Sequence, residues 1–325
     1  MVRVAIVGMG FMGKMHFNVY TEKLGNKVRV SALCDTNGEA LHIEGTKDIE
    51  KFTDYNEMLK SGGFDFVDIC LPTHLHAQTS VMAMEGGYDV FCEKPLAGTL
   101  DDADLIIKAA ERTGRLFGVG QCLRYWPAYV AVKKLIDSDS LGRVRYAEFA
   151  RFSQPPVWTS EGWVFDGKKS GNAALDLHIH DVDMVLHLFG KPEGVFSRGV
   201  FERDGSISHI STVYDYEDMV VQATGGWICA KSFGFNMRAF FVMEEATVEL
   251  DFSKQDVVKV FPEGKEAYPV ELEDGDGYYY ELKAFVEAVE KRDNSEIVTP
   301  KEAAESVKLC LREIESAKRR ERLSL

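Results

Sequence analysis

Residues 2–16 read VRVAIVGMGFMGKMH, and this stretch decides the fold of the first part of the chain. The apolar run Val4–Val7 predicts a buried strand, and the pattern of Phe11–Tyr20 predicts a helix directly after it. Between them stands a G-x-G-x-x-G turn, whose glycines are Gly8, Gly10 and Gly13. Such glycines allow a tight turn, close approach of the backbone to a pyrophosphate, and close packing of helix on strand. The N–H groups that open the helix can then bind phosphates, so we expect Gly8–Gly13, with Phe11 and Met12, to hold a nucleotide.

Strand and helix patterns go on alternating up to residue 120. Helical patterns such as Leu75–Glu85 and Asp101–Arg112 separate most of the strand candidates. The strands are continuous apolar runs, as expected of strands that helices cover on both faces. They are Val4–Val7, Val28–Cys34, Phe64–Leu71, Val90–Glu93 and Leu116–Gly120. The first part of the chain is therefore predicted to be α/β, with a doubly wound parallel sheet.

After about residue 140 the pattern changes to strands that follow one another with few helices between them. These candidates are Val144–Phe152, Val195–Phe201, Ser211–Asp215, Met219–Trp227, Ala239–Met243, Thr247–Phe252 and Val257–Phe261. One helical segment, Asn172–Phe189, precedes most of them, and two more, near Tyr279–Lys291 and Pro300–Arg320, close the sequence. We expect an antiparallel meander, and thus an α+β domain with one large, mostly antiparallel open sheet.

The size of the chain favours two domains, because 325 residues exceed what one hydrophobic core usually serves. We place them at residues 1–122 and 123–325. The C-terminal helix either stays with the second domain or packs back on the first. The net charge of -14 argues against nucleic-acid and anionic-membrane partners, which need a basic face. The six cysteines are scattered and read as reduced core thiols. With no membrane span or signal peptide recognised, we expect a cytoplasmic protein.

Asp35 indicates which nucleotide binds. It ends the second predicted strand, 22 residues after Gly13. A carboxylate there can accept hydrogen bonds from both ribose hydroxyls and would repel a 2′-phosphate. No arginine follows closely, since the next residues are Thr36-Asn37-Gly38. NAD is therefore favoured over NADP.

Two further segments carry candidate chemistry. Glu93-Lys94-Pro95 stands at the end of a predicted strand, where ligands bind in open α/β sheets, so Lys94 is either a hydrogen-bond donor to substrate or a solvated charge. Asp176 and His180 are four residues apart, which places them on one face of a helix. A histidine oriented by a carboxylate is a candidate general acid–base, although a capped helix start with a satisfied histidine has the same pattern.

Together these residues resemble the glucose-fructose oxidoreductase, inositol dehydrogenase and rhizopine catabolism (Gfo/Idh/MocA) family. The matching pieces run in order through most of the first 190 residues. They are Gly8–Gly13 with His16, Asp35, Leu71-Pro72-Thr73 with His76, Glu93-Lys94-Pro95-Leu96, Arg124-Tyr125, Gly171, Asp176 and His180, and Leu188-Phe189-Gly190.

The resemblance implies a Rossmann domain, then a domain whose open sheet often forms an oligomer interface. It also implies hydride transfer between a nicotinamide and a carbinol carbon of a sugar or cyclitol, with Lys94, Asp176 and His180 as catalytic residues. The cofactor-binding set is Gly8, Gly10, Phe11, Met12, Gly13, Asp35, Leu71, Pro72, Thr73, His76, Glu93 and Lys94. Partners are thus a small polyol and further copies of the chain, as a homodimer or homotetramer through the C-terminal sheet.

Candidate substrate contacts are Arg124, Trp126, Trp163 and His178. The tryptophans belong to an aromatic cluster with Tyr125, Trp158 and Phe165; aromatic faces line sugar sites, although large aromatics are more often core. The chain departs from the family pattern where Ser170-Gly171-Asn172 replaces a glycine cluster and His178 replaces a small residue. His178 either binds substrate or faces outward.

Two other classes remain open. A regulator that senses nucleotide or sugar could share this fold without catalysis, although the presence of Lys94, Asp176 and His180 together argues against it. A metal-dependent hydrolase or lyase could use Asp176, His178 and His180 as ligands. Positions i and i+2 of a helix point apart, however, and a third ligand is not evident, so no metal is expected.

Overall fold

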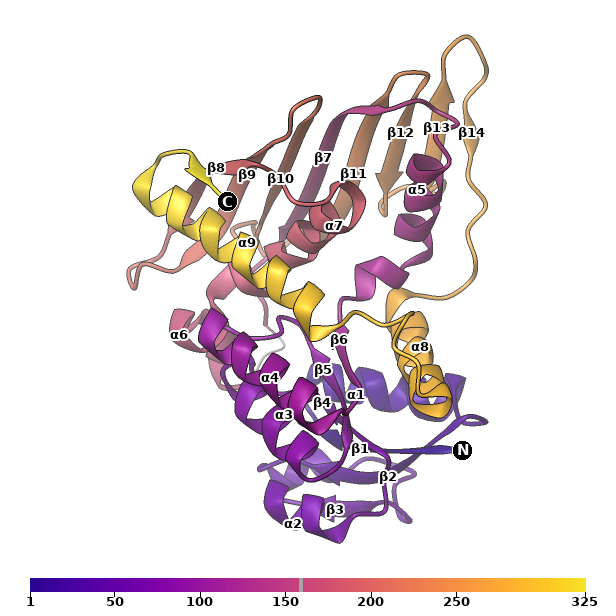
Figure 1. Cartoon of the computed structure of the whole chain (residues 1–325), viewed down its shortest axis with the longest axis vertical. Coiled ribbons are helices and arrows are strands. Elements are labelled where there is room, and N and C mark those ends of the chain that lie inside the picture. Colours follow the sequence, from indigo (N-terminus) through magenta and orange to yellow (C-terminus); the bar gives the residue numbers. More distant parts are fainter. Residues whose placement is uncertain (158–159) are drawn as a thin grey trace. The chain divides into compact units, whose positions relative to one another are not determined.

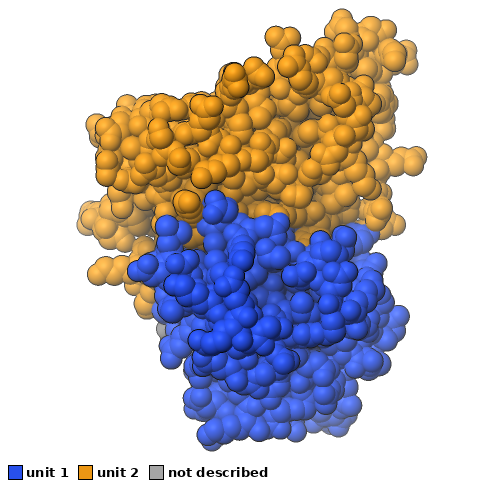
Figure 2. Space-filling view, in the orientation of Figure 1, with its two compact units in different colours: residues 1–122, 158–163, 278–305 blue, residues 123–157, 164–277, 306–325 orange. Residues whose placement is uncertain are grey.

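The structure is a computed structural model that describes residues 1–157 and 160–325. These residues form two compact units, coloured separately in Figure 2. Unit 1 consists of Met1–Cys122, the described part of residues 158–163, and Tyr278–Glu305. Unit 2 consists of Leu123–Val157, Val164–Gly277 and Ser306–Leu325. A late segment of the chain thus completes unit 1, whereas the sequence-based division assigns residues 123–325 to one domain; that division stays a prediction.

Unit 1 is built on a six-stranded sheet in which every neighbouring pair is parallel. The order is β3-β2-β1-β4-β5-β6. The strands are β1 (Val2–Val7), β2 (Val28–Cys34), β3 (Glu50–Phe52), β4 (Phe66–Ile69), β5 (Asp89–Glu93) and β6 (Phe117–Gly120). The direction of strand order reverses between β1 and β4, and ligands of such sheets bind at the carboxyl ends of the strands beside that point. The predicted doubly wound sheet is confirmed.

Helices cover this sheet. They are α1 (Phe11–Asn18), α2 (Tyr55–Ser61), α3 (His76–Glu85), α4 (Leu100–Thr113) and α8 (Gly277–Lys291). Helices α3 and α4 lie side by side (Figure 1). Helix α8 places the buried Phe285 between Phe66 and Phe91, with ring centroids 5.1 and 5.3 Å away. A Cβ on Gly118 would lie only 2.6 Å from Phe285, so the strand residue beneath this ring must be small.

Unit 2 is built on a nine-stranded sheet of order β14-β13-β12-β11-β7-β10-β9-β8-β15. Its strands are β7 (Val144–Ser153), β8 (Gly194–Phe201), β9 (Ile207–Asp215), β10 (Val220–Gly226), β11 (Phe235–Met243), β12 (Ala246–Asp251), β13 (Val258–Pro262), β14 (Tyr268–Pro269) and β15 (Leu323–Ser324). The large, mostly antiparallel sheet is confirmed. A continuous meander is wrong, because β7 lies between β10 and β11 and runs parallel to β10.

The helices of unit 2 lie on one face of this sheet (Figure 1). They are α5 (Pro127–Asp137), α7 (Ile179–Phe189) and the C-terminal part of α9 (Pro300–Arg319), with the short α6 (Gly167–Ser170). The expected helix over 172–189 is divided, because Ala174–His178 is a π-helical turn and α7 begins at Ile179. Isolated π-helical turns occur often at functional sites.

Candidate functional site

The glycine turn lies at the carboxyl end of β1, and its three glycines meet different surroundings. Gly8 has φ +89°, and a Cβ there would lie 2.5 Å from the carbonyl oxygen of Cys70. A Cβ on Gly13 would lie 1.9 Å from the carbonyl oxygen of Gly8. A Cβ on Gly10, in contrast, would meet nothing within 4 Å. Gly8 and Gly13 are therefore required by the turn itself, while Gly10 borders open space at the start of α1, where a pyrophosphate would fit.

Asp35 faces the same turn from the end of β2. Its Oδ2 accepts a hydrogen bond from the backbone N–H of Met9 at 2.7 Å, and its Oδ1 accepts one from Asn37 at 2.8 Å. A carboxylate has about four lone-pair sites, so both oxygens keep capacity for further donors. The carboxylate is thus oriented toward the glycine turn and can still accept from ribose hydroxyls.

The loops after β4 and β5 are joined by His76. Its Nδ1 lies 2.8 Å from the carbonyl oxygen of Pro95, and its Nε2 lies 2.7 Å from that of Leu71. His76 is buried, and burial lowers its pKa. The neutral ring donates from only one nitrogen at a time. His76 therefore contacts both loops but donates a hydrogen bond to only one of them at a time, and its contact with cofactor stays a prediction.

Beneath these loops lies a buried chain of charged groups centred on His16. Its Nδ1 is 2.9 Å from Asp68 Oδ2, and its Nε2 is 3.1 Å from Glu93 Oε1. Burial alone lowers the pKa of His16, but Asp68 and Cys70 raise it, and it lies well above its ordinary value. Glu93 therefore turns its side chain inward, so that a contact with cofactor is left to its backbone. Sequence reasoning did not identify Asp68, because a carboxylate inside a strand carries no motif.

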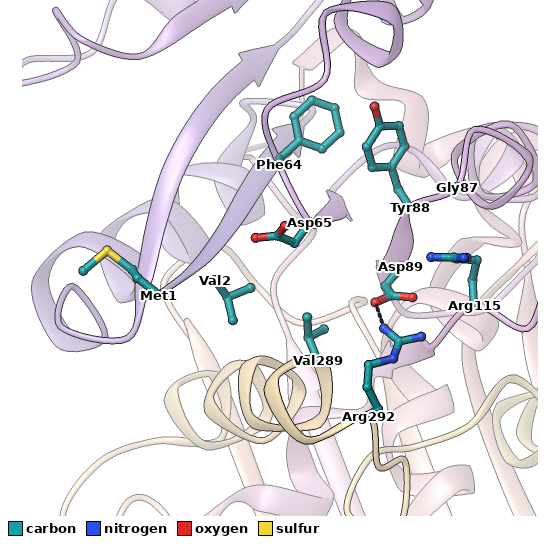
Figure 3. A pocket seen from close by; sticks show the side chains of 10 residues that line it. All are labelled: Met1, Val2, Phe64, Asp65, Gly87, Tyr88, Asp89, Arg115, Val289 and Arg292. Carbon is teal, nitrogen blue, oxygen red and sulfur yellow. Dashed lines mark hydrogen bonds and ion pairs between the residues drawn. The ribbon is translucent and has the colours of Figure 1, made fainter.

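A cavity of about 400 Å³ lies elsewhere in unit 1 (Figure 3). Its lining includes Met1 and Val2 at the start of β1, Asp65 before β4, and Asp89 at the start of β5. Asp89 is paired there with Arg292. These residues mark the amino ends of the strands, so the cavity lies at the edge opposite to the glycine turn.

In unit 2, Asp176 lies in the π-helical turn and His180 is the second residue of α7. Both side chains are half-buried, so each retains access to solvent or ligand. The turn is preceded by Asn172, which is buried with φ +58°. Asparagine tolerates this left-handed conformation better than most residues. Its side chain accepts a hydrogen bond from the N–H of Ala173 at 2.7 Å and donates to Ser206 at 2.7 Å. The departure from the family's glycine cluster is thereby explained.

His178 is part of the core. Its Nε2 lies 2.8 Å from Glu313 Oε2 on α9, and both side chains are fully buried. Glu313 also accepts from the hydroxyl of Thr212 at 3.1 Å, and a Cβ on Gly225 would lie 3.3 Å from His178 Nδ1. An outward-facing His178 is therefore wrong, because α9 covers this side of the turn. Substrate contact by His178 gains no support from this geometry.

Two more buried ion pairs hold α7. Arg151 on β7 binds Asp181 at 2.9 and 3.0 Å, and neither side chain is more than 3% exposed. Arg124 binds Asp183 through two bonds of 2.8 Å, and Ser306 donates to the same carboxylate at 2.7 Å. The guanidinium of Arg124, predicted to contact substrate, is thus committed to a bidentate pair with a buried aspartate. The helix that carries His180 is anchored to three different parts of unit 2.

The aromatic candidates fall into separate places. Trp126 packs edge-on against Phe252, with ring centroids 5.7 Å apart, and Phe165 packs against Trp227 at 6.0 Å. Trp163 is half-buried. Trp158 lies outside the described residues. Contact of Trp126 and Trp163 with substrate stays a prediction.

Metal-ligand types come together in a different place from the one considered in the sequence. In the described parts of the chain, they gather around His16, either with Asp68 and Cys70 or with Glu93 and Glu281. No such group among these residues includes Asp176, His178 or His180. Because His178 turns away to Glu313, the three do not form a common ligand set.

Family models identify the two parts of the chain. A model described as an oxidoreductase family with an NAD-binding Rossmann fold, Gfo/Idh/MocA, matches residues 2–121. The model of the Gfo/Idh/MocA C-terminal domain matches residues 129–249. The chain belongs to the Gfo/Idh/MocA family. Its glycine turn and Asp35 lie in the family's NAD-binding domain, so the cofactor is NAD.

Relatives in the Gfo/Idh/MocA family differ in their reactions. The chain is 30% identical over 218 residues to 2,7-anhydro-N-acetylneuraminate hydratase of Mediterraneibacter gnavus, covering 67% of this chain and 56% of the relative. It is 32% identical over 192 residues to scyllo-inositol 2-dehydrogenase (NAD(+)) of Bacillus subtilis, covering 58% of this chain and 54% of the relative. The chain therefore spans little more than half the length of these relatives.

Solved structures share the fold over almost the whole chain. A levoglucosan dehydrogenase in complex with NADH and levoglucosan superimposes with a TM-score of 0.86 at 20% identity, covering 99% of each chain. The chain thus has the fold of this structure over almost its whole length. None of the helices among the described residues is long and apolar enough to span a bilayer.

Proposed function

We propose that the protein is an NAD-dependent oxidoreductase that transfers a hydride between the nicotinamide and a carbinol or carbonyl carbon of a sugar, sugar derivative or cyclitol. The observation that carries the proposal is the arrangement at the carboxyl edge of the six-stranded sheet. Gly10 borders open space at a helix start, Asp35 is oriented toward the turn, and Lys94 follows a strand on the other side of the switch point. This is the donor and acceptor set that a dinucleotide needs.

Each proposed site residue has a separate role in cofactor binding or in proton transfer. NAD, when bound, accepts or returns the hydride, and the first turn of α1 and Asp35 would hold its pyrophosphate and ribose. His180 is proposed to accept the hydroxyl proton, while Asp176 fixes the tautomer of its ring. Lys94 donates a hydrogen bond to the reacting oxygen and stabilises negative charge that develops there. General acid–base catalysis of this kind contributes about 10²–10⁴-fold.

The outer face of the nine-stranded sheet is proposed to join copies of the chain into a homodimer or homotetramer. Phe196 and Val213 are cross-strand neighbours, and Phe240 lies in the same row of the sheet. Gln222 and Glu148 stand between Val213 and Phe240 in this row, and the three apolar side chains are 38–40% exposed. We also propose a cytoplasmic location. All six cysteines are free thiols, which is typical of proteins in a reducing compartment.

The test is absorbance at 340 nm with purified protein, NAD or NADP, and a panel of sugars, cyclitols and sugar acids. Turnover with NAD on one polyol supports the proposal, and His180→Ala and Lys94→Ala should then lower kcat strongly while NAD still binds. NAD binding without turnover across the panel would favour a sensor of nucleotide or sugar.

Overall hydration or elimination is a second candidate, favoured by the match to a hydratase. It predicts that a sugar is consumed without net change in absorbance at 340 nm. Mass spectrometry of the product decides, because hydration changes the mass by one water and oxidation by two hydrogens.

A further inference from the structure

His16 lies between two carboxylates in the interior of unit 1. Asp68 on β4 is 2.9 Å from one ring nitrogen and Glu93 at the end of β5 is 3.1 Å from the other. The side chains of His16 and Asp68 have no exposed surface, and that of Glu93 is 7% exposed. His16 Nδ1 is hydrogen-bonded to Asp68, whereas the contact of Nε2 with Glu93 Oε1 is an ion pair by distance without hydrogen-bond geometry.

Further acidic and neutral groups lie beside His16. Cys70 Sγ lies 3.3 Å from Nδ1, and Glu281 on α8 brings a carboxylate oxygen within 4.8 Å. Tyr20 packs edge-on against the imidazole, with ring centroids 6.5 Å apart. Among the residues named here, the imidazole is the basic group beside two buried carboxylates, and burying a carboxylate is costly unless it is paired.

Glu93 contacts both His16 and the backbone of Lys94, the predicted catalytic lysine. While its Oε1 faces His16, its Oε2 accepts a hydrogen bond from the backbone N–H of Lys94 at 3.1 Å. His16 itself belongs to α1, three residues after Gly13. Through its contact with Glu93, the His16 side chain therefore connects α1, the helix that begins at the glycine turn, with the backbone of Lys94.

We propose that His16 is a positioning residue: by bridging Asp68 and Glu93, it fixes the carboxylate that holds the amide of Lys94. His16 thereby links the nucleotide-binding turn to Lys94. The expected effect on catalysis rests on the function proposed above. Without the imidazole, Asp68 and Glu93 face each other as like charges. Glu93 must then move or take up a proton, and either change releases the backbone of Lys94.

The experiment compares wild type with His16→Gln, which keeps a polar side chain but cannot be a cation between two carboxylates. Glu93→Gln is a second variant, since its amide cannot serve both His16 and the Lys94 N–H as the carboxylate does. His42→Gln is the control, because the His42 side chain is 70% exposed and is paired with Glu39, itself exposed on the surface. Folding of each is verified by thermal unfolding.

Two readouts separate positioning from mere loss of stability. In the folded variants, kcat should fall by about 10- to 100-fold, as for a misplaced catalytic group, while Kd for NAD changes less than about threefold. The second readout needs no turnover: the rate at which an amine reagent labels Lys94 should change severalfold, whereas Lys108, 72% exposed on α4, keeps its rate.

A folded His16→Gln variant with wild-type kcat and wild-type labelling of Lys94 would overturn the proposal. So would one equivalent of a metal ion in purified protein that is lost in this variant, since His16 would then be a ligand. Absence of turnover in wild type, with altered Lys94 labelling in the variants, would contradict the proposed function and leave the positioning role supported.

Discussion

Replacing Gly10 by alanine should separate nucleotide binding from folding. Gly10 has φ −74° and ψ −152°, an extended conformation open to any residue, and its Cβ would meet no atom within 4 Å. The expected loss of stability is therefore at most about 1 kcal/mol, the preference of helix N-caps for glycine over alanine. The same methyl group would occupy the space into which the pyrophosphate must come.

The loss of binding can be estimated from the hydrogen bonds at stake. One or two backbone N–H bonds to a charged phosphate contribute about 1.5–3 kcal/mol each. Every 1.4 kcal/mol is about tenfold in affinity, so Kd for NAD should rise at least tenfold in Gly10→Ala. Gly13→Ala is the contrast, because its Cβ would lie 1.9 Å from the carbonyl oxygen of Gly8. That variant should lose about 1–3 kcal/mol or more through forced movement of the backbone.

Titration calorimetry and thermal unfolding with and without NAD measure both effects. NAD at about 100 times its wild-type Kd stabilises a folded protein that binds it by roughly 2.7 kcal/mol, and a tenfold rise in Kd should reduce this increment to about 1.4 kcal/mol in Gly10→Ala. A Gly10→Ala protein with wild-type Kd would refute the placement of the pyrophosphate at α1. An unfolded Gly10→Ala protein would refute the reading of the space beside Gly10 as open.

Three further outcomes follow from the structure. Asp35→Ala should lower the preference for NAD over NADP, measured as the ratio of kcat/KM for the two cofactors, since the carboxylate that repels a 2′-phosphate is removed. Asp181→Asn should cost about 3–5 kcal/mol in urea unfolding, because it removes the carboxylate that forms a buried bidentate ion pair with Arg151; a loss below 1 kcal/mol would contradict this. The raised pKa of His16 means that its stabilising contribution is present below its unfolded pKa of about 6.5 and is lost as pH rises through the higher folded value. The difference in unfolding free energy between wild type and His16→Gln should thus shrink at alkaline pH, and an increase there would contradict the assignment.

The fold of the first unit was largely predictable, because short stretches of sequence determine most of its strands and helices. A continuous apolar run predicts a strand covered on both faces, and the glycine spacing predicts the turn between β1 and α1. The order of strands in the second sheet was not predictable in the same way. Alternation shows which face of β7 is buried, but it does not say that β7 pairs with β10 and β11, since the partners are chosen by tertiary packing.

The candidate site shows the same limit. The motif residues Lys94, Asp176 and His180 stand out in the sequence, yet the groups that hold them do not. His178 pairs with Glu313, which is 135 residues away, and His16 pairs with Asp68, 52 residues away. Such contacts have no spacing rule. Asn172 is the exception, because an asparagine directly after a glycine is a local signal for a left-handed turn.

The return of Tyr278–Glu305 to unit 1 has a consequence for biosynthesis. Phe285 of α8 fills the space between Phe66 and Phe91, so the six-stranded sheet cannot complete its core when residue 122 leaves the ribosome. Roughly 155 more residues must be made first. Protein synthesis adds about 5–20 residues per second, so the apolar surface of the nascent sheet stays uncovered for some 8–30 s before α8 is made. During that time it is a natural target for chaperones, and a fragment that ends at residue 122 would keep this surface permanently.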